Sequence, residues 1–477
     1  MTPLSFALAH SLPEIFLAVG ALGLLMLGVY KAGGRDWIIS EAAIAILGLA
    51  LLSMFVTAPE KTLIFDDAFV DDAFGRFMKA LALGGALVSL LLSREFMMRE
   101  KIDFFEFPVL VLLATLGMLM LISASNLIAL YVGLELMRLA LYVIAAFHRD
   151  NLRASEAGLK YFVLGALSSG MLLYGASLIY GFTGSVSFVA IGAALKGSAS
   201  IGVVFGLVFM LAGLAFKMSI APFHMWTPDV YEGAPTPVTT FFATAVKMAA
   251  VAATVRIIIT AFPGVESQWR QIIVFTSIIS MAIGAFAAIG QTNLKRLMAY
   301  SSIGHMGFAL VGLAAGTETG VFGVIIYMTI YLFMTIGVFA AILSMRVDGR
   351  YVETIADLAG LSRSRKGMAF FVSMIMLSLA GIPPLAGFFA KWYVFVAAVN
   401  AGLYWLSVIG MLCSVVACFY YLRIVKVIYL DEPAAPFEPV SREVTIVMTL
   451  AGLAVTFYWV YPGPLVSAAT LAAHSLF

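Results

Sequence analysis

The sequence predicts an all-α membrane protein, a polytopic bundle of about fourteen transmembrane helices with two broken helices. Of its 477 residues, 62% are hydrophobic and only 11% are charged, whereas an ordinary soluble domain carries roughly 25% charged residues. Apolar runs, each near the ~20 residues that cross a bilayer, recur from end to end. We therefore expect residues 1–477 to form a single membrane domain with no soluble domain attached.

Each apolar run is expected to form one span, and the connections between most runs are short. The first run lacks a basic flank and a clean cleavage site, so we interpret it as a span and not as a removed signal peptide. The expected limits of the spans are 12–30, 37–57, 73–93, 107–123, 125–147, 158–181, 201–221, 237–261, 269–290, 298–314, 320–345, 368–398, 404–430 and 442–461.

Basic residues in the loops predict the orientation of the chain. Most of them follow odd-numbered spans, and the set comprises Lys31, Arg35, Arg94, Arg99, Lys101, Arg149, Arg153, Lys295, Arg296, Arg346, Arg350, Arg363, Arg365 and Lys366. The loops of the other side hold only Lys61, Arg76, Lys196 and Arg270. The positive-inside rule then places both termini outside the cytoplasm, which for a bacterial inner membrane is the periplasm.

Two spans interrupted by proline indicate an internal duplication. The seventh span is broken at Ala221–Pro222 and the twelfth at Pro383–Pro384. Proline removes a backbone donor and clashes with the preceding turn, and in lipid the freed carbonyls are tolerated only where protein or water meets them. The breaks lie five spans apart, an odd number, so two five-helix repeats would have inverted topology, as in many transporters. The alternative is that the prolines only kink packed helices.

The predicted division of the chain follows from these breaks. Three N-terminal helices occupy residues 1–106, the first repeat 107–261, the second, inverted repeat 269–430, and a C-terminal helix 442–477.

Among the ionisable residues that fall inside the expected spans, Glu135, Lys217, Lys247 and Lys391 are the main candidates for chemistry. A charge at the bilayer centre costs at least ~2.5–3.5 kcal/mol, so such residues usually have a function. We interpret Glu135 as a proton-binding carboxylate or a counter-charge for a lysine on a neighbouring helix; the alternative is a structural pair with Arg138, three residues on. For the lysines the alternative is snorkelling to the interface, which suits Lys247 least because it lies near the centre of its span.

Three further residues are weaker candidates. His224 follows the break at Pro222, and histidine suits proton relay near neutral pH; both His224 and His305 could instead be hydrogen-bonded in place. Lys160 lies near a span end, where snorkelling competes. Titratable groups spread over several spans suit lateral proton transfer along the membrane midplane and do not resemble a compact catalytic site.

The chain alone offers no visible means of binding a nucleotide or carrying electrons. It has no glycine-rich phosphate loop and no zinc-binding spacing. Its two cysteines, Cys413 and Cys418, are too few for an iron–sulfur cluster, and a net charge of +2 does not suggest nucleic acid. We expect no metal, no cofactor and no nucleic-acid partner for this chain, with the lipid bilayer as its surroundings.

Four segments resemble the subunit N family of bacterial respiratory complex I, the proton-pumping NADH:quinone oxidoreductase. They are Ser125–Leu136, Glu156–Ala166, Phe216–Pro237 and Leu377–Lys391. The resemblance covers almost the full chain, and the length also fits. Subunit L would be longer, and subunit M has a glutamate at the position of Lys391.

The resemblance implies a role for each charged residue. Glu135 and Lys217 would form the paired carboxylate and lysine of the input side, Lys247 with His224 nearby would be the central relay, and Lys391 would be the output group of the second half-channel.

Two positions qualify this assignment. Lys160 would have a supporting role. Arg138 departs from the family pattern, in which a small residue such as serine is usual. An arginine one turn from Glu135 would hold the carboxylate ionised and weaken its coupling to Lys217. We hypothesise that Arg138 faces away, toward a neighbouring subunit or the interface.

The resemblance also implies the setting. Other subunits would hold NADH, FMN, the iron–sulfur clusters and quinone and would pass the electrons, while this chain moves protons outward as a non-redox part of the enzyme. Its partners would be the other membrane-arm subunits, namely a neighbouring antiporter-like subunit and small membrane subunits. Two alternatives remain open: a stand-alone cation/proton antiporter subunit, and a scaffold that transports nothing.

Overall fold

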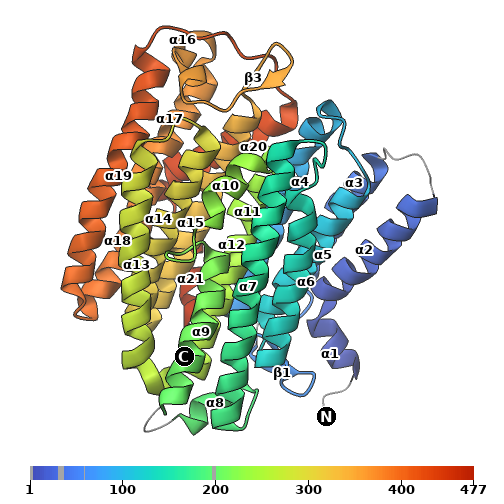
Figure 1. Ribbon diagram of the computed structural model, residues 1–477, viewed down its shortest axis with the longest axis vertical. Helices are drawn as coiled ribbons and strands as arrows, with labels where there is room; N and C mark the ends of the chain where they lie inside the picture. Colours follow the sequence, from blue (N-terminus) through green and yellow to red (C-terminus); the bar gives the residue numbers. More distant parts are fainter. Residues whose placement is uncertain (1–3, 31–36, 59, 196–199) are drawn as a thin grey trace.

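The computed structural model describes residues 4–30, 37–58, 60–195 and 200–477. Within these ranges the chain is almost entirely helical, and most of the long helices run side by side (Figure 1). The predicted all-α class is confirmed. Lys31, Arg35 and Lys196, which contributed to the charge argument, lie outside the described residues.

The elements of the first half are α1 (Leu4–His10), α2 (Leu12–Tyr30), α3 (Trp37–Ser53), β1 (Thr62–Ile64), β2 (Phe69–Asp71), α4 (Ala73–Arg99), α5 (Glu106–Ser123), α6 (Leu127–Ala145), α7 (Leu152–Thr183), α8 (Phe188–Ala194), α9 (Ile201–Met218), α10 (Trp226–Gly233), α11 (Thr236–Ala243) and α12 (Ala245–Ala261). Those of the second half are α13 (Glu266–Ile289), α14 (Leu294–Ala314), α15 (Glu318–Leu343), β3 (Arg346–Val347), β4 (Arg350–Tyr351), α16 (Leu361–Ser364), α17 (Lys366–Ala380), α18 (Ala386–Asn400), α19 (Tyr404–Leu430), α20 (Arg442–Phe457) and α21 (Gly463–His474). Short 3₁₀ turns cover Pro263–Val265, Ala356–Leu358 and Tyr458–Val460.

Twelve helices in the described part of the chain are long and apolar enough to cross a membrane. Helices α11 and α12 count as one of them, and the last extends from α20 to Val460. Three shorter apolar helices, α3, α17 and α18, lie where the second and twelfth spans were predicted. A polytopic membrane bundle is therefore confirmed.

Both predicted helix breaks are present. Helix α9 ends at Met218, Ser219 takes a left-handed conformation, and the peptide bond before Pro222 is cis. Helix α17 ends just before Gly381, which has a φ of 88°, and α18 begins after a cis Pro383–Pro384 bond. In both places a helix ends inside the bundle with its last carbonyl groups free to accept other donors.

A third break was not predicted. The eighth predicted span consists of two helices, α11 and α12, separated by Thr244 with φ −108° and ψ −94°. No proline or glycine lies within six residues of Thr244, so composition carried no signal. The interruption places the start of α12 beside the end of α9, with which it packs.

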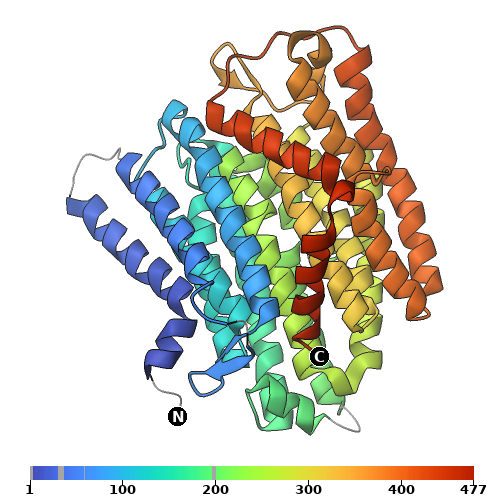
Figure 2. The same cartoon turned by 180° about the vertical axis from the view of Figure 1, so that it is seen from behind.

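Helices from the two halves of the chain pack around a common centre. Helix α15 packs against α18 and α20 and also against α4 and α11. Helix α20 crosses the bundle obliquely, and α21 runs beside α4 and α15 (Figure 2). Helix α1 and the end of α21 lie toward the same end of the bundle, whereas α16 and β3 lie at the other (Figure 1).

Two antiparallel hairpins close the ends of the bundle. Strands β1 and β2 pair Thr62 with Asp71, and β3 and β4 pair Arg346 with Tyr351. Asp72 follows β2 and caps α4, because its carboxylate accepts a hydrogen bond from the Gly75 amide at 2.7 Å.

The start of α18 is fixed against the end of α17 by a glycine. The Gly387 amide donates to the Ser378 hydroxyl at 2.8 Å, and a β-carbon at Gly387 would lie 1.8 Å from the Ser378 carbonyl oxygen. We expect Gly387→Ala to destabilise the protein by about 1–3 kcal/mol, because the backbone must move to admit the methyl group. Gly367→Ala is the matched control, since a β-carbon at that position would meet no atom within 4 Å. Thermal midpoints of the purified variants test this; equal midpoints would contradict the close packing.

Candidate functional site

Three of the lysines predicted inside spans are buried. Lys217 is 2% exposed, Lys247 0% and Lys391 6%. They come from α9, α12 and α18, so the two halves of the chain both contribute. A buried ammonium group needs polar partners, and the partners of each lysine define the site.

Lys247 lies at the end of a broken helix. Its ammonium group donates to the carbonyl oxygen of Met218, the last residue of α9, at 3.3 Å, and lies 5.8 Å from the centre of the Tyr231 ring. The C-terminal end of a helix carries partial negative charge and favours a cation. The break at Thr244 precedes Lys247 by less than one turn, and the Thr244 carbonyl accepts the Lys247 amide at 3.1 Å.

Lys391 repeats this construction in the second half of the chain. Its ammonium group donates to the carbonyl oxygens of Ala380 and Leu379, at the end of α17, at 2.9 and 3.2 Å. It also donates to the Ser414 hydroxyl at 2.8 Å and lies 4.9 Å from the centre of the Phe308 ring. Each broken helix thus ends on a buried lysine.

Lys217 has a different environment. Its ammonium group donates to the Tyr161 hydroxyl at 3.1 Å and lies 5.9 Å from the centre of the Tyr142 ring. The described structure holds no ion pair between Lys217 and Glu135, the two groups expected to pair. Glu135 and Arg138 both lie within electrostatic range of Lys217.

Glu135 is bound by its own helix neighbour. Its carboxylate accepts hydrogen bonds from the Arg138 guanidinium and from the Ser169 hydroxyl on α7. The hypothesis that Arg138 faces away is therefore wrong. Arg138 is only 8% exposed, and residues three apart on a helix share a face, so a buried guanidinium turns to the carboxylate beside it.

His305 is a buried histidine in the second half of the chain. Its ring nitrogens lie 2.6 Å from the Tyr327 hydroxyl and 3.2 Å from the Tyr421 hydroxyl, and the side chain is 3% exposed. Both Lys247 and Lys391 lie within electrostatic range of it. The sequence placed His305 among the weaker candidates, and the structure shows it buried with two tyrosine hydroxyl groups as partners.

Sequence reasoning missed the buried hydroxyl groups of this region. Tyr327 and Tyr331 lie four residues apart on one face of α15, and the Ser302 hydroxyl lies 2.8 Å from that of Tyr331. Tyrosine is common in apolar spans, so the only available signal was the four-residue spacing.

Lys160 lies outside this buried line. It pairs with Asp229 at 2.7 Å and with Glu156 at 2.8 Å, and 41% of its side chain is exposed. It lines a polar cavity of about 240 Å³ together with Arg296, which also contacts Asp229. Burial raises the pKa of Asp229, but hydrogen bonds from Lys160 and Arg296 lower it, and the net pKa is below its usual value.

His224 is not among the hydrogen-bond partners of the buried lysines in the described part of the chain. It lies in the segment between α9 and α10, partly buried, and its Nδ1 atom has no hydrogen-bond partner within the described ranges. The described contacts of the Lys247 ammonium group are with Met218 and Tyr231, so the place of His224 beside the central relay stays a prediction.

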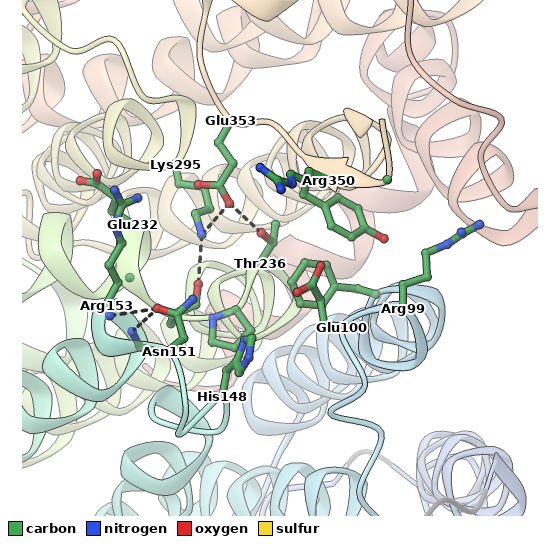
Figure 3. Close-up of a pocket in the computed structure, with 17 residues that line it drawn as sticks. Arg99, Glu100, His148, Asn151, Arg153, Glu232, Thr236, Lys295, Arg350 and Glu353 are labelled. Carbon is green, nitrogen blue, oxygen red and sulfur yellow. Dashed lines mark hydrogen bonds and ion pairs between the residues drawn. The ribbon is translucent and has the colours of Figure 1, made fainter. Parts of the chain in front are cut away.

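A polar cavity of about 510 Å³ opens at the end of the bundle that carries α16 and β3. It is bordered by the end of α4, the α6–α7 connection, the α10–α11 junction and the β3–β4 hairpin (Figure 3). Lys295 donates to the Ala234 carbonyl at 3.0 Å and pairs with Glu353 at 2.9 Å. Thr236, the first residue of α11, donates to the same carboxylate at 3.3 Å, so the cavity reaches the helix that leads toward Lys247. Among the described residues, no cluster of three histidine, cysteine or acidic side chains could hold a metal ion.

A membrane-spanning bundle with buried lysines on the ends of two broken helices defines the class of antiporter-like membrane subunits. The family model described as NADH:quinone oxidoreductase/Mrp antiporter, TM, matches residues 124–417. The chain is 66% identical over 477 residues to "NADH-quinone oxidoreductase subunit N" of Beijerinckia indica subsp. indica, covering 100% of both chains. It is 59% identical over 471 residues to the protein of the same name from Parvibaculum lavamentivorans, covering 98% and 97%.

Two solved structures share the fold. A chain of respiratory complex I from Thermus thermophilus with bound aureothin is 34% identical with a TM-score of 0.83, and the match covers 96% of this chain and 99% of that one. A chain of the Mrp complex from Dietzia sp. DQ12-45-1b is 22% identical with a TM-score of 0.88, covering 100% and 98%; at that identity it shows the fold alone. The chain belongs to the NADH-quinone oxidoreductase subunit N family, the proton-translocating, antiporter-like subunits of the complex I membrane arm.

The predicted family and function are confirmed at this level. The chain is a subunit of a translocase enzyme, a multi-pass membrane protein of bacterial complex I, and its partners are other subunits of that complex.

Proposed function

We propose that Glu135, Lys217, Lys247, His305 and Lys391 carry protons laterally through this chain and that the transfer is coupled to electron flow in other subunits. The observation that carries this proposal is the matched seating of Lys247 and Lys391, each on the carbonyl end of a broken helix. Burial favours the neutral form of a lysine and a helix C-terminus favours its ammonium form. A small movement of a neighbouring charge is then sufficient to load or release a proton.

The proposed link between the two lysines is His305, which lies within electrostatic range of both. It contacts Tyr327 and Tyr421, and a histidine can accept a proton on one nitrogen while it donates from the other. Protons reach Lys247 from the cavity at the start of α11. The hydroxyl groups of Thr236, Thr240 and Thr244 are spaced by four residues and share one face of this segment.

The proposed topology has fourteen crossings. Helix α3 forms one of them and α17 with α18 forms another, because each lies in a predicted span. Residues 107–261 and 269–430 form the two inverted repeats. The termini lie in the periplasm of a bacterial inner membrane; in support, α1 and the end of α21 lie at one end of the bundle, opposite the hairpin that carries Arg346 and Arg350 (Figures 1 and 2).

The proposed neighbours are another antiporter-like subunit and the small membrane subunits of the membrane arm. NADH, FMN, the iron–sulfur clusters and quinone bind in other subunits. Redox-driven changes there alter the charge or position of groups near Glu135, and the line of lysines responds.

The test is NADH-driven proton pumping in inverted membrane vesicles that carry Lys247→Ala. We expect pumping to fall to background, because no other ammonium group contacts the end of α9 among the described residues. Lys426→Ala is the matched control: this lysine is 60% exposed and, among the described residues, its ion pair is with Asp431, so pumping should be unchanged. Assembly is checked through NADH oxidation with an artificial electron acceptor.

The outcomes separate the rival functions. Unchanged pumping in assembled Lys247→Ala vesicles would favour a scaffold that transports nothing. Cation/proton exchange by the isolated chain, without NADH, would favour a stand-alone antiporter subunit.

A further inference from the structure

We propose that Arg138 is a second counter-ion for Glu135 and competes with Lys217 for this carboxylate, so that proton uptake in this chain is controlled by an exchange of two cations on one anion. The inference rests on the proposed function of Glu135 and Lys217 and adds a positioning residue to it.

The contacts define one of the two arrangements. The Arg138 guanidinium binds the Glu135 carboxylate with one nitrogen and donates to the Gly165 carbonyl at 2.9 Å with another. Ser169 donates to the second oxygen of Glu135. Both oxygens of the carboxylate are therefore occupied, and Lys217 is left with the Tyr161 hydroxyl.

The two cations share one aromatic ring. The Arg138 guanidinium lies 5.5 Å and the Lys217 ammonium 5.9 Å from the centre of the Tyr142 ring, and a cation is attracted to the face of such a ring. A single carboxylate within electrostatic range of two buried cations neutralises only one of them. A shift of Glu135 from Arg138 to Lys217 exchanges which cation is compensated.

The surroundings hold an unused polar atom for the second arrangement. The Nε atom of Arg138 is buried and has no hydrogen-bond partner within the part of the chain that the structure describes, and the buried Tyr142 side chain lies against the same guanidinium. Buried polar atoms without partners are costly. The presence of such an atom beside Glu135 fits a site with two alternative arrangements, each of which leaves some polar atoms without a hydrogen bond.

This exchange would determine when Lys217 binds a proton and when it releases one. While Arg138 holds Glu135, Lys217 has no anionic contact and its neutral form is favoured. When Glu135 turns to Lys217, the ammonium form is favoured and a proton is taken up. In this second arrangement the Arg138 guanidinium would keep its hydrogen bond to the Gly165 carbonyl and would therefore stay between α6 and α7.

The experiment compares Arg138→Gln with Arg138→Lys in NADH-driven proton pumping by vesicles with the assembled complex. Glutamine can still donate to the Gly165 carbonyl but has no charge, whereas lysine retains the charge. We expect Arg138→Gln to lower the protons pumped per NADH oxidised about fivefold and Arg138→Lys to retain most of it. In a Glu135→Gln background, Arg138→Gln should cause no further loss.

Three results would overturn the inference. They are equal pumping by Arg138→Gln and the parent, equal losses in Arg138→Gln and Arg138→Lys, or the same fivefold loss with and without Glu135. Each of these results would mean that Arg138 has only a structural role, namely to hold α6 against α7. Normal pumping by Lys247→Ala would instead remove the proposed function itself, so the two failures are distinguishable.

Discussion

Arg256→Ala is expected to lower the free energy of unfolding by about 3–5 kcal/mol, because it leaves a buried carboxylate without its partner. The Arg256 guanidinium binds both oxygens of Asp72 at 2.7 and 2.8 Å, and its Nε atom donates to the Ile122 carbonyl at 2.9 Å. Asp72 is completely buried and Arg256 is 3% exposed. This pair joins α12 to the N-terminal cap of α4.

Thermal unfolding of the purified protein in detergent measures the effect, and a matched series isolates the charge. Asp72→Asn retains an oxygen for the Gly75 amide while it removes the negative charge. The double variant Arg256→Met with Asp72→Asn should recover much of the loss, because it leaves no unpaired ion. If Arg256→Ala and the double variant unfolded at the same temperature, packing and not charge would explain the effect.

Lys391→Met is expected to abolish proton pumping by the assembled complex. Methionine nearly matches the length of the lysine side chain and fills its space, but it cannot carry a proton, and the Leu379 and Ala380 carbonyls lose their donor. A positioned acid–base group commonly contributes ~10²–10⁴-fold to a proton-transfer rate, which places the residual rate below the background of a vesicle assay.

Ser414→Ala is the control for Lys391→Met. It removes the hydroxyl contact at 2.8 Å but leaves the ammonium group on the end of α17. We expect pumping to remain within about twofold of the parent, the effect of one neutral hydrogen bond in a retained site. Pumping by Lys391→Met at the parent rate would show that the second broken helix needs no titratable group.

The spans could be predicted from sequence because burial in lipid demands long apolar runs. Helix α2 has the predicted limits 12–30, and α19 has the predicted limits 404–430. The breaks at Pro222 and Pro383–Pro384 were also predictable, since proline acts on its own helix whatever surrounds it. These signals are local in the chain and need no knowledge of its neighbours.

Partners across the bundle could not be predicted in this way. The break at Thr244 is made where α11 and α12 pack against other helices, and no residue there forbids a continuous helix. The contacts of His305 come from α15 and α19. Arg138 was misjudged because an outward side chain would have left Glu135 free to couple with Lys217. A buried guanidinium instead turns to the nearest carboxylate, because an unpaired buried charge is costly.

The role of Lys160 in the path stays a prediction. Its place in a segment that resembles the family favoured a role in the path, but Asp229, Glu156 and the open cavity keep it at the exposed side of α7. A decision on its role would need its distance from Lys217 and Lys247, and an amino-acid sequence does not give distances between residues on different helices.

The break between α11 and α12 has a mechanical consequence. A continuous helix behaves as a rod, so a twist applied at one end is felt along its length. Here a single residue, Thr244, separates two rods, and a few degrees of rotation about its backbone act as a pivot. Helix α11 can therefore tilt at the cavity side while the rest of α12 keeps its packing, and the first turn of α12, which holds Lys247 on the end of α9, lies directly beside the pivot.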